Sequence, residues 1–279
     1  MPIIAITREM GSLGKDVASG LSQELDLPIV YHELADRLAD RMRLRKSHVV
    51  RLLDGSAGLL ERLTADKTSL TIFSEDEIFD LALQSKGAVV RGWGATQLLR
   101  DIPHAICVRV CAPFEVRKHR MMKRLDSDDG QSVSIEIHCN DEAHTAIIRR
   151  NFGVEWTNPE NYDVVFNTER ISVAECIDEV VRLVKSEAFA ETEESRQRLE
   201  DFALAARVRA ALRLAPLTRK LKLSVVAKAG HVTLSGKTSI DSLLAAAEVV
   251  PGVPGVSDFD YRSVVLEAAQ EPDNARVAP

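Results

Sequence analysis

The sequence has few cysteines, little glycine and no long apolar run. Its 279 residues include 4 Cys and 14 Gly, and no two cysteines form a CxxC pair, which excludes a disulfide-stapled scaffold and a collagen-like chain. The longest apolar runs, such as residues 3–6, fall far below the ~20 residues that span a bilayer. No basic segment precedes the first of these runs. We therefore expect neither a membrane span nor a secretory signal, and we expect a cytoplasmic protein with reduced thiols.

The composition is that of a folded protein with two domains. Hydrophobic residues make up 45% of the chain and charged residues 28%, which excludes a disordered chain. The length suits one large and one small domain. Residues 186–201 carry six acidic and two basic residues and no Gly or Pro, as a polar connector would. We predict a domain at residues 1–187, an acidic connector at 188–201, a small domain at 202–267 and a flexible tail at 268–279.

The first domain alternates strand-like and helix-like segments, a pattern that predicts an α/β domain with a largely parallel sheet. Ser172 with Glu175, and Ser74 with Glu77, have the spacing of capping boxes at helix N-termini. The clearest strand-like segments are residues 3–7, 88–91, 105–110 and 162–168.

A glycine-containing turn, REMGSLGKD at residues 8–16, follows the first strand and opens into a helix. Glycines let backbone N–H groups converge on an anion, and Lys15 stands where a lysine reaches the β and γ phosphates of a nucleotide. The P-loop pattern GxxxxGK[ST] is met only in part. Glu9 replaces its first glycine, and Asp16 replaces the hydroxyl residue that meets Mg²⁺. The turn alone leaves open both a phosphate site and a plain strand-to-helix connection.

Three stretches carry a family resemblance. They are ITREMGSLGKDVA with the later LPIVY, then VVRGWGATQLLRDIPHAICVRVCAPFEVRKHRMMKRL, and finally EWTNPENYDVVFNTERIS. Together they resemble the cytidylate kinase-like proteins, a branch of the P-loop nucleoside monophosphate kinases, over residues 1–187. The resemblance implies a three-layer P-loop domain that binds ATP and Mg²⁺. It also implies transfer of the γ-phosphate to a nucleoside monophosphate, CMP being one candidate acceptor.

The resemblance also implies site residues, mostly cations, because phosphoryl transfer needs positive charge around the moving group. Arg91 is the candidate for binding the acceptor. No metal site follows from the histidines and cysteines, since His138, Cys139 and His144 would scatter around a helix. Arg120 and Lys123 precede Arg124 at helical spacing, and the catalytic candidates are Lys15, Arg124, Arg149 and Arg150. The nucleotide-binding candidates are Gly11, Ser12, Leu13, Gly14, Lys15 and Asp16.

Two departures from the family pattern motivate an alternative function. Trp93 stands where the family has an arginine that binds the acceptor's phosphate, and a Trp cannot make that contact. The segment Asp141-Glu142-Ala143-His144 is acidic and neutral where the family's lid is basic. The alternative is therefore a nucleotide-binding regulator without turnover, whose second domain engages a membrane or protein partner.

The second domain has the pattern of a small α+β unit. A helix at residues 205–214, a hairpin at 223–236, a helix at 239–250 and a last strand at 259–265 resemble a BON domain, a bacterial module. Its basic residues between Arg207 and Lys222 suit an anionic phospholipid surface or a protein partner. Phe202 is the only aromatic residue near them, so base stacking with nucleic acid is not expected.

Overall fold

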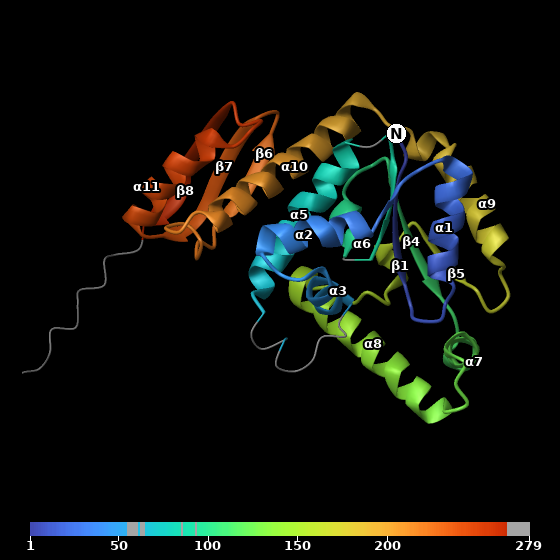
Figure 1. The fold of residues 1–279 in the computed structure, drawn as a ribbon. Helices are drawn as coiled ribbons and strands as arrows, with labels where there is room; N and C mark the ends of the chain where they lie inside the picture. The colour runs from blue at the N-terminus through green and yellow to red at the C-terminus, as the bar shows by residue number, and fades with distance from the viewer. Residues whose placement is uncertain (55–60, 62–64, 85, 93, 267–279) are drawn as a thin grey trace, which may run out of the picture. The chain divides into compact units, whose positions relative to one another are not determined.

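The computed structural model describes residues 1–54, 61, 65–84, 86–92 and 94–266 (Figure 1). The chain divides into two compact units, Met1–Leu199 and Glu200–Pro279, and each has its own sheet and its own apolar core. Trp93 and the predicted tail at 268–279 lie outside the described residues. No helix in the described part of the chain is long and apolar enough to cross a membrane.

The first unit is built on a five-stranded parallel sheet with the order β2-β3-β1-β4-β5. In the register, Ile6 of β1 lies opposite Arg91 of β3 and opposite Val108 of β4. Because the strands are parallel, their carboxyl ends meet at one edge of the sheet, where ligands bind in α/β folds. The strands are β1 (Ile3–Arg8), β2 (Ile29–Val30), β3 (Ala88–Arg91), β4 (Ala105–Cys111) and β5 (Val164–Asn167).

Helices cover both faces of this sheet, which confirms the predicted α/β fold (Figure 1). On one face, α1 and α9 pack on each other and on the fully buried side chains of Ile4, Ile6 and Val108. The Ser172–Glu175 capping box at the start of α9 is confirmed. The first face carries α1 (Gly14–Leu25) and α9 (Val173–Val184), and the other carries α2 (His32–Met42), α5 (Lys67–Gln84) and α6 (Ala95–Leu99).

The capping box predicted at Ser74 and Glu77 is wrong. The helix α5 begins at Lys67, where the Asp66 carboxylate accepts the N–H of Ser69 at 3.0 Å and caps the first turn. Ser74 and Glu77 therefore lie inside the helix, and Glu77 accepts a hydrogen bond from Arg41 at 3.0 Å.

Two further helices reach beyond the sheet and pack on each other through Met121, Val133 and Ile137. The second of them starts at an Asp129 cap and ends at Gly153, whose φ is +69°. The helices are α7 (Phe114–Leu125) and α8 (Gly130–Phe152), and the first unit also contains α3 (Lys46–Asp54) and the short helices η1 (Pro159–Asn161) and η2 (Glu187–Phe189).

The second unit has a three-stranded sheet with the order β6-β7-β8. The predicted hairpin is confirmed, since β6 and β7 are antiparallel, and β8 pairs with β7 in parallel after α11. The helix predicted from residue 205 begins earlier, at Glu193. The helix α10 (Glu193–Leu214) begins before the boundary at Leu199 and continues into the second unit. The other elements of this unit are β6 (Ser224–Lys228), β7 (His231–Thr238), α11 (Ile240–Val249), η3 (Val250–Gly252) and β8 (Asp258–Leu266).

Candidate functional site

The loop between β1 and α1 has a backbone that requires its glycines. Gly11 has a φ of +81° and Leu13 a φ of +62°, so the chain turns through the left-handed region twice. A Cβ at Gly11 would lie 2.8 Å from the carbonyl oxygen of Arg117, and a Cβ at Gly14 would lie 2.6 Å from the Cβ of Arg8. Both positions therefore exclude a side chain.

The carbonyl groups of residues 9–13 all accept hydrogen bonds from their surroundings. The N–H groups of Gly11, Leu13, Gly14 and Lys15 have no acceptor in the part of the chain that the structure describes. A loop with engaged carbonyls and free N–H groups at a helix N-terminus has a geometry that suits an anion. The donors to the carbonyls are Ser12 on Glu9 (2.8 Å), Arg117 on Met10 (3.4 Å), Arg120 on Gly11 (3.5 Å), Thr168 on Ser12 (2.8 Å), and the N–H groups of Asp16 (2.9 Å) and Val17 (3.0 Å) on Leu13.

Glu9, which replaces the first glycine of the P-loop pattern, is held by buried cations. Its carboxylate accepts from Arg109 at 2.7 Å and from the N–H of Ala112 at 3.2 Å, and lies 3.4 Å from Arg117 Nε. Arg117 also binds Asp141 of α8 through two hydrogen bonds, of 3.2 and 2.9 Å. The negative charge of Glu9 is therefore neutralised, and the same network ties the loop to α7 and α8.

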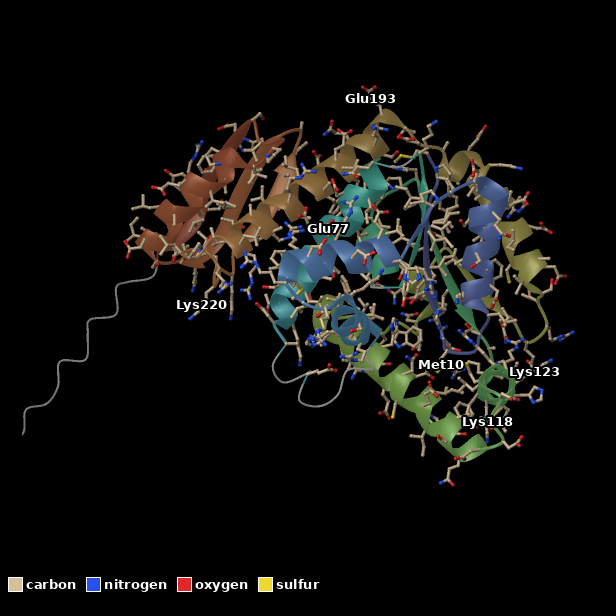
Figure 2. All side chains as sticks on the ribbon, in the orientation of Figure 1. Met10, Glu77, Lys118, Lys123, Glu193 and Lys220 are labelled. Atoms are coloured by element: carbon tan, nitrogen blue, oxygen red, sulfur yellow. The ribbon has the colours of Figure 1, made fainter. Side chains whose placement is uncertain are left out.

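A cavity of about 570 Å³ lies against this loop; we call it the loop cavity. Lys15, Lys123 and Arg124 line it, are exposed, and have no ion pair or hydrogen-bonding side-chain partner among the described residues. Figure 2 labels Met10 in the loop and Lys123 on α7. The loop cavity thus combines free N–H groups with unpaired cations. Its lining residues are Arg8, Glu9, Gly11, Leu13, Gly14, Lys15, Asp16, Arg120, Met121, Lys123 and Arg124.

The structure does not bring all the predicted arginines to this cavity. Arg120 lines it but donates to the hydroxyl of Thr168 at 3.0 Å and to its carbonyl at 2.7 Å, so it anchors the end of β5. Arg149 is on the exposed surface of α8 and pairs with Glu155. Arg150 lines a different pocket. Of the predicted catalytic residues, only Lys15 and Arg124 lie together at the loop cavity.

The segment EWTNPENYDVV serves mainly as an internal support. The indole of Trp156 donates to Thr145 of α8 at 2.8 Å, and the Tyr162 hydroxyl donates to the carbonyl of Trp156 at 2.5 Å. Burial raises the pKa of Tyr162 to about 12. Asp163 accepts the N–H of Cys107 at 2.6 Å. Through these bonds the segment connects α8, at Thr145, to β4, at Cys107.

A second, smaller pocket of about 50 Å³ opens at the ends of β1 and β3; we call it the arginine pocket. Arg91, the predicted acceptor-binding residue, is buried there with its guanidinium 4.0 Å above the ring of Tyr31. Stacking of this kind holds a guanidinium in place without neutralising its charge. The lining residues are Thr7, Arg8, Tyr31, Leu53, Arg91, Gly92, Asn140 and His144.

His144 faces this pocket as a neutral imidazole. Its Nε2 lies 3.3 Å from the hydroxyl of Thr7, and its ring meets that of Trp156 edge to face at 4.4 Å. Burial first, and then the charges of Arg8 and Arg109, lower the pKa of His144 to about 4. At neutral pH the predicted lid segment therefore presents a neutral hydrogen-bonding group here.

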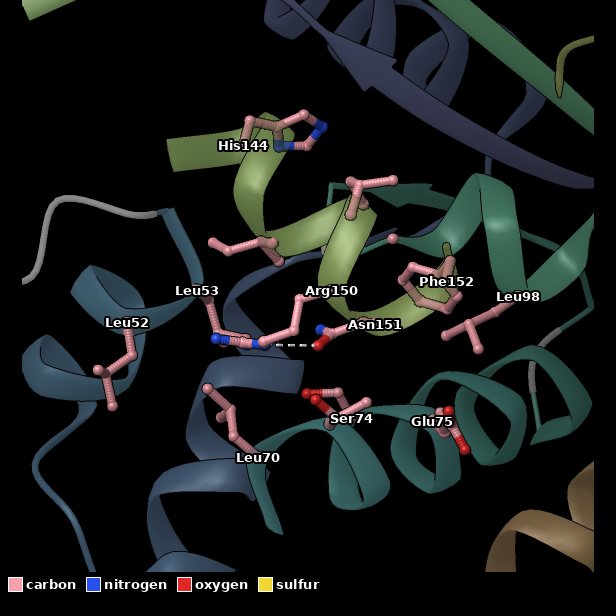
Figure 3. A pocket seen from close by; sticks show the side chains of 14 residues that line it. Leu52, Leu53, Leu70, Ser74, Glu75, Leu98, His144, Arg150, Asn151 and Phe152 are labelled. Atoms are coloured by element: carbon pink, nitrogen blue, oxygen red, sulfur yellow. Dashed lines mark hydrogen bonds between the residues drawn. The ribbon is translucent and has the colours of Figure 1, made fainter. Parts of the chain in front are cut away.

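A third pocket, of about 40 Å³, lies between α3, α5, α6 and α8 (Figure 3); we call it the apolar pocket. It shares Leu53 and His144 with the arginine pocket. The buried hydroxyl of Ser74 has no hydrogen-bond partner among the described residues, and Arg150 donates to Asn151 at 3.1 Å. The other lining residues are Leu52, Leu70, Thr71, Glu75, Gly94, Leu98, Ile147, Ile148 and Phe152.

Comparison with known proteins identifies the family. The model of the cytidylate kinase-like family matches residues 3–170, which is more than half of the chain. The chain belongs to the cytidylate kinase-like family. A search of the curated proteins found no match.

Three solved structures are similar to parts of this cytidylate kinase-like chain, and the first of them shares its fold. An uncharacterized protein from Eubacterium ventriosum has 20% identity and a TM-score of 0.53, and the match covers 67% of this chain and 100% of that one. A shikimate kinase from Bacteroides thetaiotaomicron has 14% identity and a TM-score of 0.41, with 66% and 99% covered. A shikimate kinase from Acinetobacter baumannii in complex with shikimate has 10% identity and a TM-score of 0.40, with 66% and 93% covered.

These findings confirm the family that the sequence predicted for the first domain. The family model ends at residue 170, so the BON resemblance at residues 202–267 and the domain limits stay predictions.

Sequence reasoning missed two residues of the site. Arg8 lines both the loop cavity and the arginine pocket, and Glu9 is a paired anchor. The available signal for Arg8 was its position at the end of the strand that precedes a phosphate-type turn.

Proposed function

We propose that the chain transfers the γ-phosphate of ATP to a nucleoside monophosphate, with CMP as the first acceptor to test. The observation that carries this proposal is the loop after β1, in which the carbonyls of residues 9–13 are engaged while the N–H groups of Gly11, Leu13, Gly14 and Lys15 have no acceptor among the described residues. Its cavity is also lined by the unpaired cations named above. Phosphoryl transfer depends on positioning and positive charge more than on covalent chemistry by the protein. The loop cavity supplies both.

The loop cavity suits the donor. The free N–H groups of Gly11, Leu13, Gly14 and Lys15 would hold the β-phosphate, and the Lys15 ammonium would reach the β and γ oxygens. Lys123 and Arg124 project from α7 into the same cavity and would meet the remaining charge. Mg²⁺ binds through one or two carboxylates and substrate phosphates. Asp16, exposed at the start of α1 and lining the cavity, is the carboxylate that fits this role.

The arginine and apolar pockets suit the acceptor. Arg91 and Arg8 would bind its phosphate, and the apolar pocket, which shares Leu53 and His144 with the arginine pocket, would take its base. The two pockets have volumes of about 50 and 40 Å³, whereas sites for small molecules measure roughly 300 Å³ or more. We therefore expect α3 and α8 to separate when the acceptor binds.

A second candidate function is a nucleotide-binding regulator without turnover. It is favoured by Trp93 in place of the family's arginine and by the lid segment, in which Asp141 is bound to Arg117 and His144 is neutral. In this case nucleotide occupancy would change what the second unit, as a BON domain, contacts on a membrane or a protein.

A coupled assay of ADP release separates the two functions. The full-length chain is incubated with Mg-ATP and each common nucleoside monophosphate, with Lys15→Ala as the binding-site variant and Arg182→Gln as a control. Arg182 is exposed on α9 and pairs only with Glu179 among the described residues. Acceptor-dependent turnover that is lost in Lys15→Ala excludes the regulator. ATP binding seen by calorimetry without turnover for any acceptor excludes the kinase.

A further inference from the structure

Arg91 is a buried cation for which the described part of the chain supplies no anion. The residue is 8% exposed, and a guanidinium stays charged at every pH at which proteins are folded. Its one contact of this kind among the described residues is the ring of Tyr31, and no Asp or Glu is among the described residues that line the arginine pocket. Because an unpaired buried charge is costly, we expect a bound anion to complete this pocket.

The other two buried arginines of the described chain are held in a different way. Arg109 binds Glu9 at 2.7 Å, and Arg117 binds Asp141 at 2.9 Å. A carboxylate fixes each of these guanidinium groups but also neutralises its charge and occupies its N–H donors. Neither of them is therefore available to a phosphate, whereas Arg91 keeps its full charge.

The ring of Tyr31 holds Arg91 in place of a carboxylate. In the register of β2 and β3, Val30 lies opposite Val90, and the next residues along the chain are Tyr31 and Arg91. The guanidinium lies 4.0 Å above the centre of the ring. The ring is itself packed edge to face against His32, with centroids 4.9 Å apart. The position of Arg91 is thus set by an aromatic face on the neighbouring strand.

Room for a ligand lies beside the guanidinium. Gly92, the next residue, has a φ of +79°, and its N–H donates to the carbonyl of Ile6 at 2.9 Å, which fixes the backbone at this point. Apart from its chain neighbours, a Cβ at Gly92 would meet no heavy atom of the described residues within 4 Å. The described chain therefore leaves open space next to its unpaired buried arginine.

We propose that Tyr31 is a positioning residue, whose ring holds the Arg91 guanidinium ready to bind the acceptor's phosphate; this assignment rests on the proposed function. An aromatic face fixes a guanidinium without using its charge. The N–H donors at the edge of the guanidinium stay available for the two parallel hydrogen bonds by which an arginine binds a phosphate. Tyr31 acts on the acceptor only through Arg91.

The test compares the full-length chain with Tyr31→Leu, Tyr31→Phe, Arg91→Gln and the matched control Tyr261→Leu. Tyr261 is an exposed tyrosine on β8 of the second unit. Calorimetry measures the binding of each common nucleoside monophosphate and, separately, of a non-hydrolysable ATP analogue with Mg²⁺. The ADP-release assay then gives kcat and the acceptor's KM for the monophosphate that binds best.

We expect Tyr31→Leu to weaken monophosphate binding, and to raise the acceptor's KM, by about 10- to 30-fold, which corresponds to the loss of a desolvated cation–π contact. Tyr31→Phe keeps the ring and should bind like the wild type. Arg91→Gln removes the phosphate contact itself and should weaken binding by about 100-fold or more. Binding of the ATP analogue should change by less than about threefold in every variant, which distinguishes positioning of Arg91 from a general loss of structure.

A second variant covers the case in which Tyr31→Leu does not fold, as loss of its urea transition would show. Pentafluorophenylalanine at position 31 keeps the shape of the ring, but its face no longer attracts a cation. The same loss of monophosphate binding is then expected in this variant.

Three results contradict these assignments. Unchanged monophosphate binding in Tyr31→Leu or in the fluorinated variant, or binding by Tyr31→Phe as weak as that by Tyr31→Leu, overturns the role of Tyr31; turnover by the wild-type chain leaves the proposed function standing. Binding that depends on the ring, without turnover of any acceptor, overturns the proposed transfer and leaves Tyr31 assigned to a monophosphate site. A wild-type chain that binds no nucleoside monophosphate overturns both.

Discussion

Replacing Glu9 by the glycine of the P-loop pattern should lower the folding stability of the first unit. The pattern suggests that Glu9→Gly restores a better phosphate loop. In the structure, however, Glu9 binds the buried Arg109 at 2.7 Å, lies 3.4 Å from the buried Arg117, and accepts the N–H of Ala112 at 3.2 Å. Arg117 keeps Asp141 when Glu9 is removed, whereas Arg109 loses the one carboxylate shown bound to it. The main cost is therefore an uncompensated guanidinium at Arg109.

The size of the effect follows from burial. Arg109 is 8% exposed and Arg117 6%, and removing one partner of a buried ion pair costs about 3–5 kcal/mol. The low end applies, because one of the two arginines keeps a partner. About 3 kcal/mol is a large part of the 5–15 kcal/mol that holds a typical domain folded. With a urea m-value of about 1–3 kcal/mol per molar, the midpoint should fall by roughly 1–3 M.

Tryptophan fluorescence during urea unfolding measures this change. The chain has 2 Trp, at positions 93 and 156, and both belong to the first unit, so the signal reports on that unit alone. Glu9→Gln removes the charge but keeps an oxygen for the N–H of Ala112, and Glu179→Gln removes an exposed carboxylate as the matched control. We expect Glu9→Gly to be the least stable, Glu9→Gln to lie between, and Glu179→Gln to match the wild type. An unchanged or higher midpoint in Glu9→Gly would refute the reasoning.

Three further predictions concern the pockets. The double variant Lys123→Ala with Arg124→Ala should raise the KM for ATP and weaken its salt dependence, measured by the ADP-release assay at two ionic strengths, because both cations at the loop cavity are unpaired among the described residues. His144 has a pKa of about 4 in the folded chain and a pKa of about 6.5 in the unfolded chain. Stability should therefore fall as the pH drops through this interval, and His144→Gln should reduce that loss in urea midpoints compared at pH 7 and 5. Ser74→Ala removes a buried hydroxyl without a partner, so it should not destabilise the fold but should raise the acceptor's KM; an unchanged KM places the acceptor outside the apolar pocket.

The strands and the capped helix α9 could be predicted because their signals are local. The apolar run at residues 88–91 is β3, and Ser172 with Glu175 forms the predicted box. The box at Ser74 failed for a reason that is not local to it: Asp66 caps the helix earlier, and Glu77 is engaged by Arg41 of α2. The local sequence at Ser74 and Glu77 does not show that Asp66, which is upstream, already caps the helix.

The glycine turn between β1 and α1 could be predicted from the sequence, but the pairing of the charges around it could not. A sequence shows that Arg109, Arg117, Arg120, Lys123 and Arg124 are cations; it does not show which of them meet carboxylates from distant segments. The structure distinguishes the paired cations from the unpaired ones. Arg117, for example, meets Glu9, which is 108 residues away in the sequence, and Asp141, which is 24 residues away.

 Arg109 and Arg117 bind those carboxylates and act as structural anchors, and Arg120 is bound by Thr168. Lys123 and Arg124 have no such partner among the described residues and remain available to a ligand.

The same pairing explains how an acidic chain can have a positively charged loop cavity. The net charge of the whole sequence is −6, which taken alone would disfavour binding of a nucleotide. At the loop cavity, however, the two lining carboxylates, Glu9 and Asp16, are in different environments. Glu9 is neutralised by buried arginines, and Asp16 stands exposed where a metal ion would join it to phosphate. Because Lys15, Lys123 and Arg124 have no such partners among the described residues, the local field at the loop is positive whatever the total charge. A charge-reversing change far from the cavity, such as Arg182→Glu on α9, should therefore leave ATP affinity nearly unchanged, whereas Lys123→Glu should weaken it strongly.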